Sequence, residues 1–268
     1  MESKSGLRIA VCEERVRIGN NSDGGYVLCK NDLQVSTGVL SFGVNDDWSF
    51  EKAISLRMQG IGIDCYDFSI SRNYFFENYS RVILRFFTGR LSLNSFLRAL
   101  TIPFAYIFFF RGRIRHFQER VTNTIRRSGE IDIASIFSRT QSLSVIVKVD
   151  IEGAEYKIIN DLLMYRDRIS TLIVEFHEID FLKEKFIKSL REISEYFDLI
   201  HVHGNNHAHL DKSLNVPSII EMTFSRIGVH SQPLDQISCP TKGLDFPNNL
   251  EVSDFSFTLY SSITAENY

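Results

Sequence analysis

The sequence contains few cysteines, and they form no recognisable motif. No CxxC pair occurs, and the four cysteines are widely scattered: Cys12, Cys29, Cys65 and Cys239. This arrangement speaks against a zinc knuckle and against a thioredoxin-type redox site. The first residues, MESKSGLRIAVCEERVRIG, also lack the long apolar segment of a signal peptide. We therefore expect a cytoplasmic protein whose cysteines are free thiols.

Long apolar runs and a large net charge are missing as well. The most apolar stretch, ALTIPFAYIFFF at 99–110, has 12 residues, whereas a helix that spans a membrane needs about 20. The net charge of −3 argues against a general nucleic-acid binder. What the chain does contain, 268 residues of which 44% are hydrophobic, is enough for one large globular domain.

The chain alternates between short apolar runs and segments with helical periodicity. This alternation is typical of an α/β fold with a mostly parallel sheet between helices. We expect strands at 38–44, 61–66, 81–87, 144–150, 171–178, 198–204 and 218–224, and helices at 46–60, 151–164 and 179–197. The last two strands are expected to form an antiparallel pair at the sheet edge. The whole chain, 1–268, is predicted to be a single domain, with an N-terminal segment at 1–36 and a helical insertion at about 88–140.

Polar residues gather where the predicted strands end. In an open α/β sheet, ligands bind beyond the carboxyl ends of the strands. Gly43 and Asp67 follow the first two strands at a spacing of 24 residues, the distance at which a Rossmann-like fold presents a carboxylate to ribose hydroxyls. The turn is not GxGxxG, because Gly43 is its only glycine. A dinucleotide such as NAD is therefore disfavoured.

Several motifs are similar to those of one enzyme family. The run KVDIEGAE at 148–155 resembles the KxDxEGxE motif of FkbM-type methyltransferases, in a strand-to-helix context. Other segments fit a sugar-related bacterial branch: RIGNNSDGGYVL at 17–28, LSFGVNDDWSFE at 40–51, LIVEFHEID at 172–180, HVHGNN at 201–206 and LDFPNN at 244–249. The resemblance covers most of the chain except about 88–140. It implies a Rossmann-like class I methyltransferase sheet, mostly parallel with an antiparallel edge strand. The turn SFGVNDD at 41–47 departs from the more glycine-rich turn of many methyltransferases.

The resemblance and the strand-end positions together give roles to individual residues. The cofactor would be S-adenosylmethionine, bound by Ser41, Phe42, Gly43, Asp67, Lys148 and Asp150. The acceptor would be bound by Asp23, Glu152, Glu175, Asn205 and Asn206. The base that takes the proton of the acceptor hydroxyl would be Asp150, His177 or His203. If the reaction uses a divalent cation such as Mg²⁺, its oxygen ligands would be Asp150, Glu152 and Glu175.

Each of these residues also has a purely structural interpretation. Lys148 lies inside an apolar strand, where it needs a partner such as a buried carboxylate. Asp150 and Glu152 could cap the helix that follows them. The histidines could be satisfied members of the core, and the segment Asp23–Tyr26 could be a simple turn instead of a lid over the site.

The predicted function is that of an S-adenosylmethionine-dependent O-methyltransferase. Its acceptor would be a sugar hydroxyl in surface polysaccharide or glycoconjugate biosynthesis, carried by a saccharide, a nucleotide-sugar or a lipid-linked sugar. Two alternatives remain open: an NAD-dependent enzyme that modifies nucleotide-sugars, and a non-catalytic cofactor-binding protein. A homo-oligomer is also open.

The predicted insertion is strongly basic, unlike the rest of the chain. Residues 85–139 contain ten arginines and only three acidic residues, Glu119, Glu130 and Asp132, around the apolar run at 99–110. An apolar helix flanked by arginines suits an anionic membrane surface or the phosphates of a lipid-linked saccharide. This would place the protein peripherally at the inner face of the membrane. A dimer interface or a solvated helical cap is the alternative.

Overall fold

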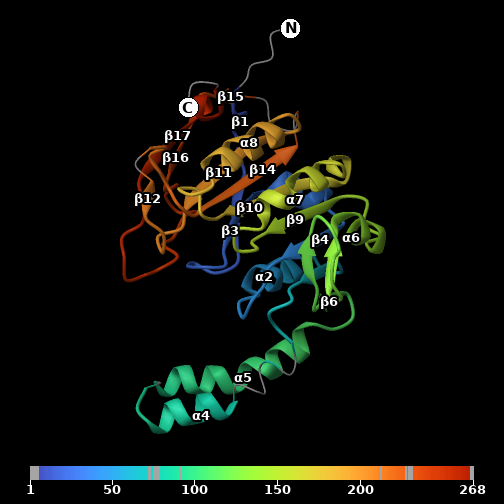
Figure 1. The fold of residues 1–268 in the computed structure, drawn as a ribbon, viewed down its shortest axis with the longest axis vertical. Helices are drawn as coiled ribbons and strands as arrows, with labels where there is room; N and C mark the ends of the chain where they lie inside the picture. Colours follow the sequence, from blue (N-terminus) through green and yellow to red (C-terminus); the bar gives the residue numbers. More distant parts are fainter. Residues whose placement is uncertain are drawn as a thin grey trace.

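A nine-stranded mixed sheet organises the molecule (Figure 1). The structure is a computed structural model and describes residues 6–71, 74, 79–90, 92–211, 213–226, 228 and 232–265. The order across the sheet is β15 (Pro233–Leu234), β1 (Ile9–Ala10), β11 (Phe197–Gly204), β14 (Ile220–Arg226), β10 (Ile169–Phe176), β9 (Val145–Val149), β4 (Gly38–Phe42), β5 (Gly62–Tyr66) and β6 (Ile114–Phe117). From β10 to β6 all neighbours are parallel.

The predicted Rossmann-like α/β fold is confirmed. Strands β4, β5, β9, β10, β11 and β14 all lie where the apolar runs predict them, within two residues. Strands β11 and β14 pair in an antiparallel manner, as expected. The sheet nevertheless continues past them, because β1 adds to β11 in parallel and β15 closes this edge in an antiparallel manner.

Helices cover both faces of the sheet because its strands are apolar on both sides. In β9, Val147 belongs to the core cluster shared with α6 (Ile133–Arg139), α7 (Glu155–Leu163) and α8 (Lys183–Ser194). The preceding residue, Ile146, belongs to a second core cluster with α1 (Lys30–Val35) and α2 (Ser49–Arg57). Successive side chains of a strand point to opposite faces. The continuous apolar run of β9 is therefore the signature of a strand buried on both faces.

The segment predicted as a helical insertion is only partly helical. Residues 81–87, expected as a strand, lie in α4 (Tyr79–Phe87), and α5 (Leu93–Phe109) follows. Beyond α5 the chain returns to the sheet as β6, then forms the small pair β7 (Arg120–Thr122) and β8 (Glu130–Asp132) before α6. The expectation failed at β6 because this strand has only four residues, IRHF, at the edge of the sheet. An edge strand is half-exposed and needs no continuous apolar run.

Three further two-stranded pairs complete the chain around the carboxyl edge of the sheet. They are β2 (Arg15–Ile18) with β3 (Tyr26–Cys29), β12 (Leu210–Asp211) with β13 (Val216–Pro217), and β16 (Gln236–Cys239) with β17 (Phe257–Tyr260). Two short 3₁₀ helices, η1 (Arg166–Arg168) and η2 (Ser261–Thr264), connect elements of the body. The β2–β3 hairpin brings Tyr26 to the end of the sheet.

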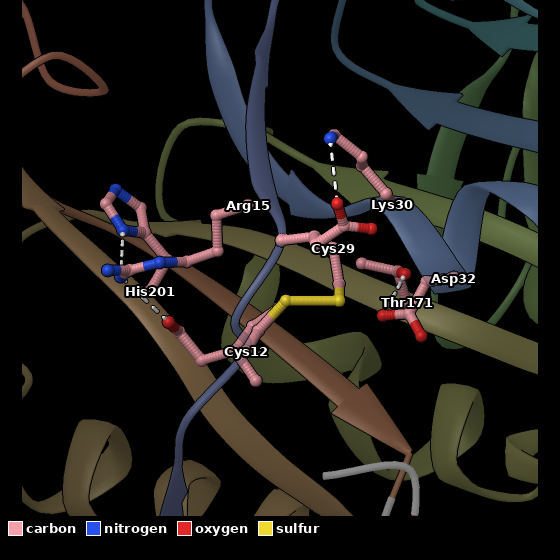
Figure 2. The surroundings of a disulfide bond; sticks show 9 residues. Cys12, Arg15, Cys29, Lys30, Asp32, Thr171 and His201 are labelled. Atoms are coloured by element: carbon pink, nitrogen blue, oxygen red, sulfur yellow. Dashed lines mark hydrogen bonds and ion pairs between the residues drawn. A yellow bond between two sulfur atoms is a disulfide. The ribbon is translucent and has the colours of Figure 1, made fainter.

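A disulfide ties the first residues of the chain to this hairpin. Cys12 and Cys29 are bonded and buried, beside the Arg15–His201 contact (Figure 2). The expectation of free thiols is therefore wrong for these two residues, while Cys65 and Cys239 are free and buried. The spacing of the cysteines in the sequence could not reveal the bond. Cys12 follows β1 and Cys29 ends β3, and only the folded arrangement of these two strands brings the cysteines together. Disulfides persist mainly in oxidising compartments, so the cysteines no longer support a cytoplasmic location.

Helices α4 and α5 form an arm that projects from the body (Figure 1). Phe86 of α4 stacks on Phe96 of α5, with ring centroids 4.2 Å apart. The far end of α5 is anchored on the body, where Trp48 contacts Tyr106 and Phe110. None of the helices in the described ranges is long and apolar enough to cross a membrane.

Candidate active site

A cavity of about 780 Å³ opens at the carboxyl ends of the parallel strands. Its walls come from the segments that follow β4, β5, β6, β9 and β10, with further residues from the β2–β3 hairpin and from the end of β11. This is the edge at which an open α/β sheet binds ligands, and the volume falls within the range of small-molecule sites.

The turn after β4 can be built only with glycine. Gly43 has a φ of +79°, and a Cβ placed on it would lie 1.6 Å from the carbonyl oxygen of Asp150. Its N–H donates to Tyr66 at the end of β5. The turn is thus pressed against the ends of both neighbouring strands, and its backbone forms one wall of the cavity. The close neighbour that excludes a side chain at Gly43 is the Asp150 backbone, and contact of Gly43 with a cofactor stays a prediction.

Asp67 lies on the cavity wall but is already well bonded. Its Oδ2 accepts hydrogen bonds from the N–H groups of Val44 and Asn45, each at 2.8 Å. Its Oδ1 accepts from the N–H and the hydroxyl of Ser69, at 2.7 and 2.6 Å. Burial alone would raise the pKa of this carboxyl, but these four donors outweigh it and lower the pKa. Of the four, only the rotatable Ser69 hydroxyl is easily replaced by a ligand hydroxyl.

Lys148 supports the same turn from within the sheet. It is buried in β9, and its Nζ donates to the Gly43 carbonyl at 2.6 Å and contacts Asp150 Oδ2 at 3.4 Å. Burial by itself lowers the pKa of the ammonium, but the nearby carboxylates Asp150, Glu51 and Glu175 reverse the direction and raise it. The charged Lys148 side chain therefore links the Gly43 turn to the carboxylates of the site.

Two carboxylates of the site share one tyrosine. The hydroxyl of Tyr26 lies 3.3 Å from Asp150 Oδ2 and 3.5 Å from Glu175 Oε2. The amide of Asn205 donates to Glu175 Oε1 at 2.8 Å. Burial, followed by repulsion from Asp150 and Glu221, raises the pKa of Glu175 well above its ordinary value. A buried carboxyl with like charges beside it is a frequent feature of functional sites.

His177 completes this group directly after β10. Its Nδ1 lies 2.7 Å from Oε1 of the fully buried Glu155, while its Nε2 faces the cavity with Asp150 Oδ1 and Glu175 Oε1 both at 3.9 Å. Burial lowers the pKa of the ring, but the hydrogen bond with Glu155 and the surrounding carboxylates outweigh it and raise the pKa to about 9. The carboxylates around the ring therefore favour its protonated form while no other cation balances their charge.

The structure brings most of the predicted site residues together. Those that line the cavity are Asp23, Gly43, Asp67, Lys148, Asp150, Glu152, Glu175, His177 and Asn205. Glu152 differs from the rest, because its side chain is 86% exposed. Four predicted site residues are not part of the cavity wall: Ser41, Phe42, His203 and Asn206.

These four residues face the interior of the protein instead. Ser41 is buried and donates to the buried Glu51, and Phe42 packs in the core against Tyr66. They end β4, so their side chains point into the two faces of the sheet while only the turn beyond them reaches the cavity. His203 is 1% exposed and lies between Glu221 and Asp254. This position does not suit a base that must reach an acceptor.

The cavity also contains residues that sequence reasoning missed. Tyr26 belongs to the DGGY segment, where only Asp23 had been given a role. Phe68 and the segment Glu119–Thr122 line the far side of the cavity, and the guanidinium of Arg120 lies 3.6 Å from the centre of the Phe68 ring. Phe68 directly follows Asp67 and could have been found from that position. The Glu119–Thr122 segment could not, because β6, which positions it, was not predicted.

The cavity wall is predominantly acidic. It contains eight acidic side chains, Asp23, Asp46, Asp47, Asp67, Glu119, Asp150, Glu152 and Glu175, against Arg120, Lys148, Lys157 and the two histidines His177 and His207. Lys148 is fully engaged with the protein, as described above. Such a wall favours a cationic ligand and disfavours a pyrophosphate.

Comparisons with known proteins give little beyond this geometry. No protein-family model and no curated protein matches the chain. A solved structure from Thermoplasma acidophilum, described as a "putative methyltransferase", is similar at 13% sequence identity and a TM-score of 0.35, over 71% of this chain and 67% of that one. A likeness at this level carries no argument about function, and the site has to be interpreted from its own residues.

Proposed function

We propose that the protein is an S-adenosylmethionine-dependent O-methyltransferase. The observation that carries this proposal is the acidic cavity at the Gly43 turn, with Asp150, Glu175 and His177 gathered on one wall. The FkbM-like run at 148–155 supplies two of the features of this wall, Lys148 and Asp150. A pyrophosphate-binding enzyme would instead need a glycine-rich cradle, which this turn does not have.

The residues of the cavity fit the proposed cofactor. S-adenosylmethionine supplies a methyl group on a positively charged sulfur, and its ammonium group adds a second positive charge. The carboxylates of the wall favour both charges, and the Gly43 backbone leaves room beside them. Asp67 would receive a ribose hydroxyl at Oδ1 in place of the Ser69 hydroxyl, while its Oδ2 continues to hold the turn.

Asp150 is the best-placed group to take the proton of the acceptor. Its side chain is 26% exposed and lines the cavity, whereas Glu175 is buried and the pKa of the His177 ring is raised to about 9. Lys148 and Tyr26 hold its Oδ2 and leave Oδ1 toward the cavity. Positioned proton transfer of this kind contributes about 10²–10⁴ to a rate. His177 would compensate the charge that appears when the hydroxyl loses its proton.

A sugar suits the remaining wall of the cavity. Asp23, Glu175, Asn205 and His207 offer carboxylate, amide and imidazole groups on the cavity wall. Such groups recognise several neighbouring hydroxyls at once. This supports a saccharide acceptor, and with it a role in making surface polysaccharide or glycoconjugate.

Two experiments test the proposal. Calorimetry with S-adenosylmethionine, S-adenosylhomocysteine and NAD should show binding of the first two only. Transfer of a radiolabelled methyl group should then label glycans extracted from the source cell. Binding of NAD in their place would identify the nucleotide-sugar-modifying alternative. Binding of S-adenosylmethionine without any transfer would favour the non-catalytic alternative.

We also propose that the α4–α5 arm meets an anionic membrane surface. Leu84 and Phe87 of α4 are 65% and 79% exposed, and Leu97 of α5 is 51% exposed. Arg85 and Arg90 are exposed beside them. Apolar side chains next to arginines on a projecting arm match the two demands of a lipid interface, a hydrophobic face and positive charge. A lipid-linked sugar would be brought to the enzyme at the same surface.

The structure narrows which arginines of the basic segment could take part. Arg115 forms a two-pronged ion pair with Asp64, and Arg139 pairs with Glu119. Arg113 donates to the Gly60 carbonyl. These three arginines form contacts within the body of the protein. The side chain of Arg98, also in the basic segment, lies outside the described residues.

Vesicle sedimentation tests the arm. The protein should co-sediment with anionic vesicles at low salt, and less at high salt or with neutral vesicles. The variant Arg85→Glu/Arg90→Glu should reduce recovery, since each basic residue contributes about 1 kcal/mol near an anionic surface. The matched control Arg126→Glu/Arg127→Glu changes two exposed arginines away from the arm. Equal loss in both variants, or no binding at all, would contradict the proposal. A dimer that disappears in Phe87→Ser would show that a second copy covers the arm.

A further inference from the structure

Three potential metal ligands converge on one point of the cavity wall. One carboxylate oxygen each of Asp150 and Glu175 and a ring nitrogen of His177 lie within 4.8 Å of one another. Nε2 of His177 lies 3.9 Å from Asp150 Oδ1 and 3.9 Å from Glu175 Oε1. Both separations exceed hydrogen-bond distance, so the ring nitrogen faces the two carboxylate oxygens across a gap.

The histidine is oriented from behind. Its Nδ1 lies 2.7 Å from Glu155 Oε1, and Glu155 is fully buried and also accepts from the Gly153 N–H at 3.0 Å. Because a carboxylate can only accept here, Nδ1 is the protonated nitrogen, and in the neutral ring the lone pair lies on Nε2 and faces the gap. Histidines that bind metals are almost always held in this way by a carboxylate or carbonyl on the other nitrogen.

The two carboxylates are oriented from behind as well. Lys148 and Tyr26 both contact Oδ2 of Asp150, so that Oδ1 is the oxygen nearer to His177. Tyr26 also reaches Oε2 of Glu175, and Asn205 donates to its Oε1. All three candidate ligands are thus fixed by neighbours that are not themselves ligands, which is the second layer of contacts expected around a metal.

We propose that Asp150, Glu175 and His177 bind a divalent cation with mixed nitrogen and oxygen preference, such as Mn²⁺ or Zn²⁺. One imidazole with two carboxylates suits these ions better than Mg²⁺, which prefers oxygen ligands throughout. The ligand set differs from the sequence-based prediction, because His177 takes the place of Glu152. Glu152 Oε2 lies 3.7 Å from His177 Nε2, but its exposed side chain is not part of the converging group.

The site has open positions on its cavity side. Three protein ligands leave room for water or a substrate oxygen on a four- to six-coordinate ion. Resting on the proposed function, a bound cation would hold the acceptor hydroxyl and make its proton more acidic. Asp150 would then act as a ligand of the cation, and the acidified hydroxyl would lose its proton to water in the cavity. The competing interpretation is that the proton on His177 alone balances the carboxylates, and that no ion enters.

Metal binding can be measured without any methyl transfer. Full-length protein freed of metal with a chelator would be titrated with MnCl₂, ZnCl₂ and MgCl₂ by calorimetry, with the paramagnetic resonance of Mn²⁺ as a second readout. We expect one Mn²⁺ or Zn²⁺ per chain and weaker binding of Mg²⁺. His177→Ala should weaken Mn²⁺ binding at least about tenfold, and Glu155→Gln should weaken it about 10–100-fold by releasing the ring. Glu184→Gln, which changes an exposed carboxylate of α8 outside the cavity wall, is the matched control and should bind Mn²⁺ like the wild type.

The outcomes separate this proposal from the proposed function. No metal binding by the wild type, or equal affinity in folded His177→Ala and wild type, overturns the metal site. Circular dichroism establishes that each variant is folded, and Asp150→Asn serves as a second ligand variant if His177→Ala fails to fold. Metal binding without S-adenosylmethionine binding would leave the site standing and reject the methyltransferase. Binding of S-adenosylmethionine without any metal binding would reject the metal site and leave the proposed methyltransferase standing.

Discussion

The strands that flank β14 carry histidine–carboxylate clusters that differ in their access to the cavity, and those of His177 and His203 make the clearest comparison. His177 follows β10 and has Glu155 on one nitrogen, with the other nitrogen directed to the cavity. His203 lies in β11, and both of its nitrogens are occupied, by Glu221 at 3.4 Å and by Asp254 at 3.1 Å. The pKa of both rings is raised, to about 9 and about 10, although burial alone would lower each.

The comparison shows that a perturbed pKa does not by itself identify a catalytic residue. Ion pairs inside the protein perturb pKa values as strongly as an active site does. What separates the two clusters is the direction of the second nitrogen. For His203 that direction is filled by Asp254, which is 51 positions away in the chain.

Asp150→Asn and Asp254→Asn should separate the clusters most clearly. The first removes the proton acceptor proposed for the reaction and should lower turnover by about 10²–10⁴. The second changes a partner of the buried His203 and should leave turnover nearly unchanged, while it lowers the melting temperature because a buried charged partner is lost. Steady-state methyl transfer and thermal melting of both variants provide the measurement. Similar losses of turnover in both would mean that the two clusters act as one unit.

The pH dependence of the unfolding free energy should show whether the buried His203 is charged in the folded protein. The folded-state pKa of His203, about 10, is above the ordinary value of 6.5, so its ion pairs stabilise the fold fully below about pH 6.5. This contribution is lost as the pH rises toward 10, at up to about 1.4 kcal/mol per pH unit. Urea unfolding at pH 7 and pH 9 would measure it. His203→Gln should flatten this slope, and an unchanged slope would show that the ring is neutral in the folded protein.

Asp67 tests whether a carboxylate with all acceptor positions filled can still bind a ligand. Asp67→Ala should weaken S-adenosylmethionine binding at least about tenfold, because a ribose contact worth about 1.5–3 kcal/mol is lost together with the support of the turn. Ser69→Ala removes only the replaceable hydroxyl and should change affinity less than about threefold. Calorimetry on both variants provides the measurement. Unchanged affinity in folded Asp67→Ala would assign this residue to the turn alone.

Much of the sheet could be predicted from the sequence because its central strands are apolar on both faces. The run at 145–149 has no polar residue except Lys148, which is typical of a strand buried on both faces. The predictions for edge strand β6 and helix α4 were wrong for the same reason. Short segments that mix arginines with aromatic residues fit a strand and a helix equally well. Their structure is decided by tertiary contacts, such as the stacking of Phe86 on Phe96.

The candidate site was predictable in its location but not in its membership. Strand ends fix where polar residues meet, and Asp150, Glu175 and His177 do meet there. Which side chains face the cavity depends on the last residue of each strand and on distant loops. Ser41 ends up against Glu51 in α2, and the carboxyl of Asp254 reaches His203 from a loop near the end of the chain. Neither contact has a signal in the local sequence.

The neighbours Asn205 and Asn206 repeat the comparison on a smaller scale. Asn205 donates to Glu175 Oε1 at 2.8 Å and lines the cavity. Asn206 donates to the carbonyls of Asn249 and Val252, each at 2.9 Å, and accepts from the Asn249 N–H at 2.7 Å. Adjacent residues at the end of a strand point in opposite directions. One amide therefore serves the site, and the other ties down the loop that follows.

Substituting each asparagine by alanine should split kinetics from stability. Asn205→Ala removes a contact to Glu175 and should raise the KM for the acceptor about fivefold, since one hydrogen bond is worth roughly 1 kcal/mol. Asn206→Ala leaves three backbone groups without their partner and should lower the melting temperature, with KM and kcat near the wild-type values. Initial rates at several acceptor concentrations and a thermal melt of each variant suffice. If Asn206→Ala raised KM while keeping its melting temperature, the loop at 249–252 would have to contact the acceptor. This loop would then belong to the active site and not only to the protein interior.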